Sequence, residues 1–251
     1  RAATQQRVQL SRAYRRASQI EHYSANRRRR TTSEERTDVA MRPHVLCYAL
    51  ATASAITRTT VDVGRVSVTY DQHYFDTPVP QPRQGQRVAD RSGLRPWPCA
   101  VPLLQHLSEA TVPSLEASLG RPPRVLELGS GVGLLGIGLA LATKADVTLT
   151  DPGLPTRFSK GADSISTLEF LRRNVALNNA PTARAEKLLW GDADDLDAFS
   201  DKPPFDLVVA SEVLYEPSQY AALADTLAFF AADAIIGYKV RHGREQTFFD
   251  R

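Results

Sequence analysis

The 251-residue sequence predicts an α/β fold built on a doubly wound, mostly parallel sheet. Short apolar runs alternate with helical patterns from Arg124 onward, and a βαβαβ order of this kind is typical of parallel strands with helices on both faces. A glycine-rich turn follows the first apolar run directly, and an acid, Asp151, ends the second. These observations also predict a nucleotide-type ligand site at the carboxyl ends of the strands.

The expected elements follow one another along the chain. Strands are expected at 125–128, 147–150, 185–189, 205–210 and 234–239, with helices at 133–143, 164–178 and 218–231. Before them, a helix at 100–119 is expected to stop at Gly120, and a strand at 61–70 contains Gly64 as a turn or bulge. The Ala and Leu content of 43–56 predicts one more helix.

The chain divides by composition into three parts, which are a basic extension (1–42), a helix–strand–helix lead-in (43–120) and the ligand-binding domain (121–251). The extension holds 11 Lys and Arg and 4 Asp and Glu, whereas residues 43–251 hold 20 Lys and Arg and 24 Asp and Glu. The net charge of the whole chain is +3, so the basic character belongs to the extension. Its arginine run at 27–30 fits a nucleic-acid-binding arm or a nuclear-import tag. A solvated, disordered or helical extension is the plainer interpretation, so nucleic acid is an open but not a favoured partner.

Cysteine usage and apolar segment length bear on the compartment. Cys47 and Cys99 form no close-spaced pair, which favours neither a disulfide framework nor a structural zinc site. The longest apolar stretch outside the glycine region, at 44–56, is shorter than the roughly 20 residues that a membrane-spanning helix needs. We expect no metal, no membrane partner and a cytoplasmic location, with the nucleus as a further compartment.

The glycine turn carries the strongest evidence about the ligand. Gly129, Ser130 and Gly131 open a Gly-x-Gly-x-Gly turn, and Glu127 stands just before it. A G-x-G-x-x-G dinucleotide pattern overlaps this turn, so NAD stays an alternative cofactor. An acid at Glu127 would repel a pyrophosphate and attract the ammonium of a methionine-type amino acid, which favours S-adenosylmethionine.

Two residues further along the chain extend the expected cofactor site. Asp151 suits a pair of ribose hydroxyls because a carboxylate can accept from both, although Asp also caps turns before residues such as Pro152. Trp190 follows the third strand, where it could lie beside an adenine ring or serve in core packing.

The segment after the fourth strand supplies candidate catalytic groups, because a doubly wound sheet places such groups there. On a turn of helix, Glu212 and Tyr215 would share a face, and a carboxylate beside a phenol could hold an amine. The alternative is a helix cap at Ser211 or Glu212. On the expected helix at 164–178, Asn174 and Asn178 stand four apart and are expected to hydrogen-bond a specific structural partner.

This combination of motifs resembles the seven-β-strand protein-lysine methyltransferases, a family with members that act on calmodulin, heat-shock chaperones, valosin-containing protein and translation elongation factors. The resemblance covers about residues 61–250 and rests on Glu-Leu-Gly-Ser-Gly-Val-Gly at 127–133, Asp151, Asn174 with Asn178, Leu-Trp-Gly at 189–191, Glu-Val-Leu-Tyr at 212–215, and Gly93 with Trp97 and Pro98. It implies a Rossmann-like class I methyltransferase that transfers a methyl group from S-adenosylmethionine to a lysine of a non-histone protein.

The resemblance also implies roles for individual residues. Trp97 would line the methionine end of the cofactor, Asp151 would hold the ribose, and Glu212 with Tyr215 would border the methyl-transfer channel. The candidate cofactor-binding residues are therefore Trp97, Glu127, Gly129, Ser130, Gly131, Asp151, Trp190 and Ser211, and the candidate catalytic residues are Glu212 and Tyr215.

Three features depart from the family pattern. Glu212 stands where the family usually has Asp, and the connection at 152–164 looks longer than usual. No C-terminal helix and antiparallel hairpin follow the fifth strand before Arg251, which predicts an unprotected sheet edge. The alternatives are a small-molecule or nucleic-acid methyltransferase of the same fold, and a catalytically silent cofactor-binding interaction module.

Overall fold

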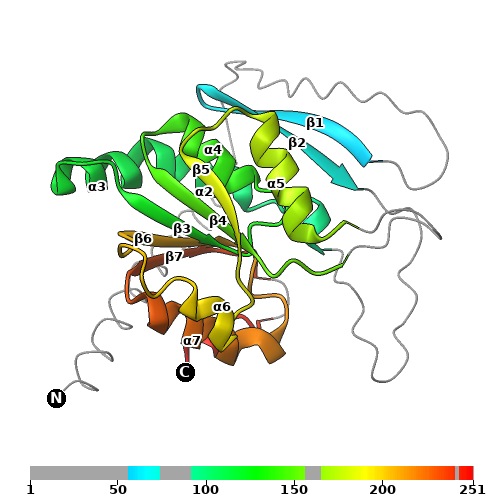
Figure 1. Cartoon of the computed structure of the whole chain (residues 1–251), viewed down its shortest axis with the longest axis vertical. Helices are drawn as coiled ribbons and strands as arrows, with labels where there is room; N and C mark the ends of the chain where they lie inside the picture. The colour runs from blue at the N-terminus through cyan, green and yellow to red at the C-terminus, as the bar shows by residue number, and fades with distance from the viewer. Residues whose placement is uncertain (1–55, 74–91, 156–164, 241–242, 251) are drawn as a thin grey trace, which may run out of the picture.

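A five-stranded parallel sheet in the order β5-β4-β3-β6-β7 forms the centre of the molecule (Figure 1). The computed structural model describes residues 56–73, 92–155, 165–240 and 243–250. The strands are Arg124–Leu128 (β3), Asp146–Asp151 (β4), Ala183–Lys187 (β5), Leu207–Ser211 (β6) and Asp233–Gly237 (β7). The chain winds outward from β3 to β5 and returns to β6 beside β3, so the carboxyl ends of β3 and β6 flank the reversal point where open α/β sheets bind ligands.

The sheet separates two apolar cores because side chains alternate between the faces of each strand. Val125 of β3 belongs to the first core, and Leu126 and Leu128 belong to the second. The same alternation operates on β6, where Val209 faces the first core and Val208 the second. Glu127 shares the face of Val125, so its side chain is directed toward the first core.

Three helical segments cover the first face of the sheet (Figure 1). They are α4 (Leu134–Ala142), α5 (Thr167–Leu177) and the run of α2 (Ala100–His106), a π turn (Leu107–Thr111) and α3 (Val112–Leu119). Gly120 ends the last of these in the left-handed conformation, with φ of 66°. The predicted helix at 100–119 is therefore confirmed, together with the residue that stops it.

A β-hairpin packs on the outside of these helices. Its strands β1 (Ile56–Val63) and β2 (Val66–His73) are antiparallel, with Gly64 at the turn at φ of 60°. The predicted strand at 61–70 is two antiparallel strands, and of the two alternatives given for Gly64 the structure has the turn and not the bulge. β2 contacts α4 and α5, and its Val68 is buried in the first core.

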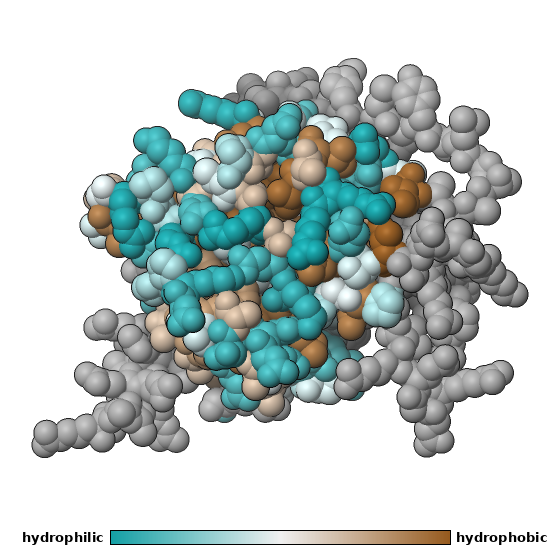
Figure 2. All heavy atoms as spheres, viewed as in Figure 1, coloured by the Kyte–Doolittle hydropathy of each residue, from teal (hydrophilic) through white to brown (hydrophobic). Residues whose placement is uncertain are grey.

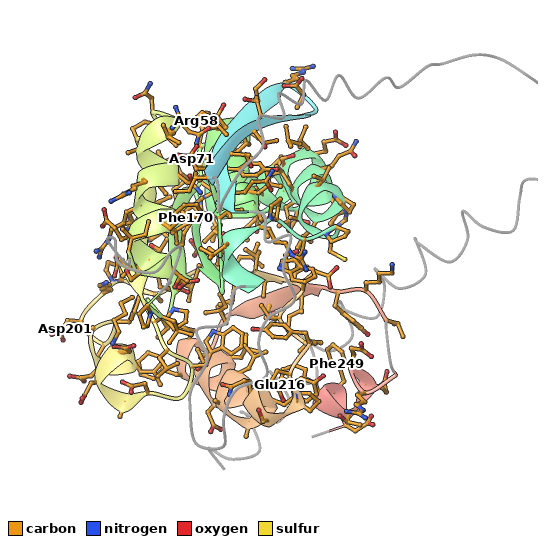
Figure 3. The ribbon with its side chains drawn as sticks, turned by 90° about the vertical axis from the view of Figure 1, so that its right-hand side faces the viewer. Arg58, Asp71, Phe170, Asp201, Glu216 and Phe249 are labelled. Carbon is orange, nitrogen blue, oxygen red and sulfur yellow. The ribbon has the colours of Figure 1, made fainter. Side chains whose placement is uncertain are left out.

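The second face carries α6 (Ala193–Asp197), α7 (Tyr220–Phe230), preceded by the 3₁₀ turn Pro217–Gln219, and α8 (Gln246–Phe249). Figure 3 shows this layer from the side, with Glu216 and Phe249 below the sheet and Arg58, Asp71 and Phe170 on the opposite side. Aromatic rings fill much of the second core. Phe230 packs edge-on against Phe199 and Phe205, with centroid separations of 5.4 and 5.7 Å.

The predicted fold class is confirmed, and each predicted strand of the sheet occurs with its ends shifted by a few residues. The basic extension (1–42) and the predicted helix at 43–56, apart from Ile56 in β1, lie outside the described residues. Within those residues, no helix has the length and apolar character needed to cross a membrane. The face in Figure 2 is largely hydrophilic, with apolar side chains in smaller groups.

Gly138 in α4 should resist the substitution that usually stabilises a helix. A Cβ at this position would come 2.3 Å from Leu104 Cδ2 and 3.2 Å from Val68 Cγ2, and both of these side chains are fully buried. We expect Gly138→Ala to lower the free energy of unfolding by about 1–3 kcal/mol, because a well-packed core must move to admit the methyl group. Chemical denaturation measures this change.

The exposed Ser118 of α3 provides the control, since Ser118→Ala adds no contact in either core. Its free energy of unfolding should change by less than about 0.5 kcal/mol. A Gly138→Ala variant more stable than the unmodified chain would contradict this prediction. It would mean that α4 does not pack as closely against α2 and the hairpin as the structure shows.

Candidate functional site

The glycine turn after β3 has a backbone conformation that its sequence dictates. Gly129, Gly131 and Gly133 have φ values of 67°, 54° and 88°, a region that only glycine adopts without strain. Space is also limited, because a Cβ on Gly133 would come 2.7 Å from Leu171 Cδ1 and 2.8 Å from Ile137 Cδ1. The turn can therefore carry few side chains, and its backbone is brought close to whatever lies beside it.

Hydrogen bonds from β4 hold the turn in place. The Ser130 N–H donates to the Thr150 carbonyl at 2.8 Å, and the Thr150 N–H donates to Ser130 Oγ at 3.1 Å. The Thr150 hydroxyl donates to the Glu127 carbonyl at 2.7 Å. Ser130, which was predicted to contact the cofactor, thus has a structural role in fastening the turn to the sheet. Thr150 is a supporting residue that the sequence motifs did not reveal.

The Glu127 carboxylate lies beneath the turn and accepts the Gly136 N–H at 3.0 Å. Gly136 is the third residue of α4, so Glu127 supplies the capping acceptor that Gly133, at the N-cap, has no side chain to provide. Burial raises the pKa of Glu127 to about 8, although hydrogen bonds from Ser130 and Gly136 oppose the shift. Its predicted contact with a cofactor ammonium stays a prediction.

Asp151 lies at the carboxyl end of β4 and is 5% exposed. Its Oδ1 accepts the Gly153 N–H at 3.0 Å and the Thr167 hydroxyl. The turn-capping alternative is therefore present in the structure, and the ribose-binding role stays a prediction. Thr167, the first residue of α5, was missed because no motif marks it. Its position after the N-cap Ser166 is the signal that could have found it.

The Gly93 element lies against the glycine turn. Gly93 belongs to the 3₁₀ turn Ser92–Leu94, and a Cβ on Gly131 would come 3.0 Å from the Gly93 carbonyl oxygen. The two backbones approach each other because both residues are glycine. Trp97 follows, with the Arg95 guanidinium 4.4 Å from its ring centroid, and its contact with a cofactor stays a prediction.

Trp190 lies beside the other side of the turn. A Cβ on Gly129 would come 3.1 Å from Trp190 Cζ2, so the indole ring closely approaches the first glycine. The loop that carries Trp190 is held by the Gly191 N–H, which donates to Thr226 Oγ1 at 2.9 Å, and by the Leu189 N–H, which donates to Asp195 Oδ2 at 2.8 Å. The structure therefore brings this predicted residue to the glycine turn.

Glu212 and Tyr215 do not share a helical face, so that part of the prediction is wrong. Glu212 has a φ of 59° and donates its N–H to the Gly237 carbonyl at 2.7 Å, which turns the chain away from a helical path directly after β6. The Leu214 carbonyl accepts the Tyr220 hydroxyl at 2.9 Å. As a result, Glu212 is 4% exposed and Tyr215 is 52% exposed.

The segment with Glu212 nevertheless lies next to the glycine turn. Val213, which the motifs did not single out, has its Cγ1 3.2 Å from the position of a Cβ on Gly129. The Ser211 hydroxyl is buried and has no hydrogen-bond partner within the described part of the chain. Buried polar atoms are normally satisfied, and the predicted contact of Ser211 with a cofactor stays a prediction.

The fold is that of a Rossmann-like α/β protein, and the candidate ligand site lies where β3, β4 and β6 end. A family model described as lysine methyltransferase matches residues 83–251, and the chain belongs to this family. The family resemblance read from the sequence is therefore confirmed.

Several named relatives match part of the chain. The histone-arginine methyltransferase METTL23 of Xenopus laevis is 35% identical over 55% of this chain and 51% of the relative. The protein N-lysine methyltransferase METTL21A of Mus musculus is 30% identical over a match that covers 61% of this chain and 63% of that relative. The chain spans about half of METTL23 and under two thirds of METTL21A.

The solved structure of TYW2 from Pyrococcus horikoshii, in complex with MeSAdo, is 15% identical and has a TM-score of 0.40. The match covers 78% of this chain and 59% of that one. A likeness at this level supports no conclusion about ligand or substrate.

Glu127 should make stability depend on pH in a defined direction. Its folded-state pKa of about 8 exceeds the ordinary value of 4.5, so the folded protein holds a proton that the unfolded chain releases. The contribution of Glu127 to stability is therefore lost as the pH rises through this interval. Glu127→Gln keeps an acceptor for Gly136 and carries no charge, so it should gain stability over the unmodified chain by on the order of 1–3 kcal/mol between pH 5 and pH 8.

Chemical denaturation at several pH values measures the difference between the two proteins. Glu116→Gln, which removes a surface carboxylate that pairs with Lys144, controls for the loss of an acidic side chain alone. A stability difference that stays constant with pH would show that the pKa of Glu127 is not raised.

Proposed function

We propose that this protein is an S-adenosylmethionine-dependent methyltransferase that modifies a lysine side chain of a protein. The observation that carries the proposal is the convergence of three segments on one turn. The backbone of Gly93, the ring of Trp190 and the side chain of Val213 each lie against a glycine of that turn. Asp151 and Glu212 stand at the ends of the two strands that flank β3.

The charges near the turn support S-adenosylmethionine over a dinucleotide. Asp151 and Glu212 are acidic and nearly fully buried. Two carboxylates there would oppose the pyrophosphate of NAD and favour a ligand that carries an ammonium and a sulfonium. Glu127 adds an oxygen acceptor rather than a full charge near neutral pH, because burial raises its pKa to about 8. Carboxylate oxygens at Asp151 and the hydroxyl of Ser211 add acceptors that a nucleoside ligand can use.

Bound S-adenosylmethionine would supply a methyl group that is activated by the positive charge on sulfur. The protein then has to align the acceptor amine and keep it neutral. Desolvation on entering the site would lower the pKa of a lysine and so favour the neutral amine, although a carboxylate at Glu212 opposes this shift. Glu212 would orient the amine from within the site, and the exposed Tyr215 would line the entrance.

The identity of the acceptor residue is supported by the family, which is described as lysine methyltransferase. A second candidate is arginine, because METTL23, a relative at 35% identity, is named as a histone-arginine methyltransferase. Methylation of lysine and methylation of arginine can be told apart, because acid hydrolysis of the labelled protein releases methyl-lysine in the first case and methyl-arginine in the second.

Asp151→Asn should weaken S-adenosylmethionine binding by about tenfold, because an amide accepts more weakly than a carboxylate from two ribose hydroxyls. Isothermal titration calorimetry of the full chain measures the dissociation constant. Asp146→Asn is the matched control: it lies on the same strand at the other end, where its carboxylate pairs with Arg184 and Arg124. Its affinity for the cofactor should be unchanged.

A titration with NADH tests the alternative cofactor on the same sample. Saturable binding of NADH without binding of S-adenosylmethionine would overturn the proposal in favour of an oxidoreductase. Equal affinities of the two Asp variants would remove Asp151 from the cofactor site.

Glu212→Gln should lower the rate of methyl transfer by about 10²-fold while leaving the cofactor dissociation constant unchanged, because the carboxylate positions the acceptor rather than the donor. Transfer of a labelled methyl group into lysate proteins, followed by acid hydrolysis, gives both the rate and the acceptor residue. Label in methyl-lysine is the expected result. Cofactor binding with no transfer to protein or nucleic acid would instead indicate a silent interaction module.

A further inference from the structure

One peptide group in the glycine turn is held at both of its polar ends. The Val132 carbonyl accepts a hydrogen bond from Asn174 Nδ2 at 2.9 Å, and the Gly133 N–H of the same peptide donates to the Ser130 carbonyl at 2.8 Å. In a trans peptide the carbonyl and the N–H point in opposite directions, so these two bonds together fix the orientation of the peptide plane.

This peptide would otherwise have an unusual freedom to rotate. A peptide flip changes ψ of the preceding residue and φ of the following one, and Gly133 can adopt φ of either sign because it has no Cβ. Its observed φ is 88°. Sterics alone therefore do not select the orientation at 132–133, and the hydrogen bond from Asn174 contributes to that selection.

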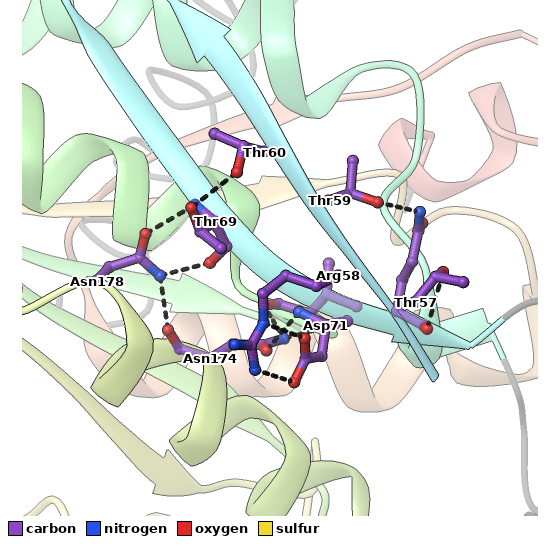
Figure 4. A network of polar contacts seen from close by, with 10 residues as sticks. Thr57, Arg58, Thr59, Thr60, Thr69, Asp71, Asn174 and Asn178 are labelled. Atoms are coloured by element: carbon purple, nitrogen blue, oxygen red, sulfur yellow. Dashed lines mark hydrogen bonds and ion pairs between the residues drawn. The ribbon is translucent and has the colours of Figure 1, made fainter. Parts of the chain in front are cut away.

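Asn174 also holds the β1–β2 hairpin (Figure 4). Its Oδ1 accepts the Asp71 N–H at 2.8 Å, and its Nδ2 donates to the Asp71 carbonyl at 3.1 Å as well as to Val132. Both amide hydrogens are thus used, one on the hairpin and one on the glycine turn. The side chain is fully buried, so a missing partner could not be replaced by bulk water.

Asn178, one helical turn further along α5, docks the hairpin in the same way without touching the glycine turn. Its Oδ1 accepts the Thr69 N–H at 2.8 Å, and its Nδ2 donates to the Thr69 carbonyl at 2.6 Å and to the Asn174 carbonyl at 2.7 Å. The two asparagines therefore share one function and differ in another, which makes Asn178 a matched control within the same helix.

We propose that Asn174 is a positioning residue that fixes the 132–133 peptide of the glycine turn and couples that turn to the β1–β2 hairpin. The inference rests on the proposed function for its cofactor, S-adenosylmethionine. The hairpin, at 56–73, lies ahead of the residues that the family model matches. Because coupling is reciprocal, a bound cofactor should also stabilise the docked hairpin.

The test compares Asn174→Ala with Asn178→Ala in the full chain. Both variants should lose stability, since each removes hydrogen bonds that dock the hairpin. Only Asn174→Ala should weaken S-adenosylmethionine binding, by about tenfold, which is the value of one hydrogen bond of ordinary strength. Titration calorimetry at a temperature where both variants are folded measures the two dissociation constants.

Amide hydrogen exchange without cofactor supplies a second measurement that does not depend on the ligand. The Gly133 amide should exchange faster in Asn174→Ala than in Asn178→Ala, because only the first frees the peptide to rotate. Should Asn174→Ala fail to fold, Asn174→Ser replaces it: the shorter side chain has a single hydroxyl hydrogen and cannot donate to both Asp71 and Val132.

The outcomes separate the two proposals. If the unmodified chain does not bind S-adenosylmethionine, the proposed function fails, and the exchange rate of Gly133 still tests Asn174. If the unmodified chain binds and the two variants bind equally well, with equal Gly133 exchange rates, Asn174 acts only in docking the hairpin and the positioning role is overturned.

Discussion

The site depends on a turn of three left-handed glycines that cannot hold its shape by itself. A side chain normally limits the φ and ψ angles of its residue. In this turn, Gly93 and Leu171 lie so close that no side chain fits at Gly131 or Gly133. The restraint is transferred to polar groups on neighbouring elements, with Thr150 of β4 fixing the start of the turn and Asn174 of α5 fixing its end. Glu127 then caps the helix that follows. The glycines allow close contact with a ligand, and the surrounding hydrogen bonds limit the flexibility that comes with it.

Much of the fold could be predicted because the signals are local. The alternation of strand and helix, the stop at Gly120 and the acid at the end of β4 are all readable from short stretches of sequence. The hairpin was missed because its first strand begins before the alternating pattern at 61–70 and Gly64 fits a bulge as well as a reversal. The chain that precedes β1 lies outside the described residues, so the extension and its compartment stay predictions.

The sequence predicted which residues gather at the candidate site better than it predicted how their side chains and backbone are arranged. The direction of Glu127 follows from strand alternation, since it shares a face with Val125, and this parity was available in the sequence. The path after β6 was not: a left-handed Glu212 is rare for a residue with a side chain, and no propensity predicts it. Thr150, Thr167 and Val213 support the site through contacts with distant segments, which a linear motif cannot show.

The hydroxyl of Tyr220 reaches the Leu214 carbonyl from α7, and the Tyr220 ring packs against Phe248 of α8. The segment that carries Glu212 therefore packs with the second core, whereas Asn174 of α5 connects the glycine turn to the layer of the first core. The two halves of the site meet at the contact between Val213 and Gly129, yet they rest on separate layers. A substitution that repacks the second core can therefore shift the segment with Glu212 while the contacts of Asn174 in the other layer stay in place.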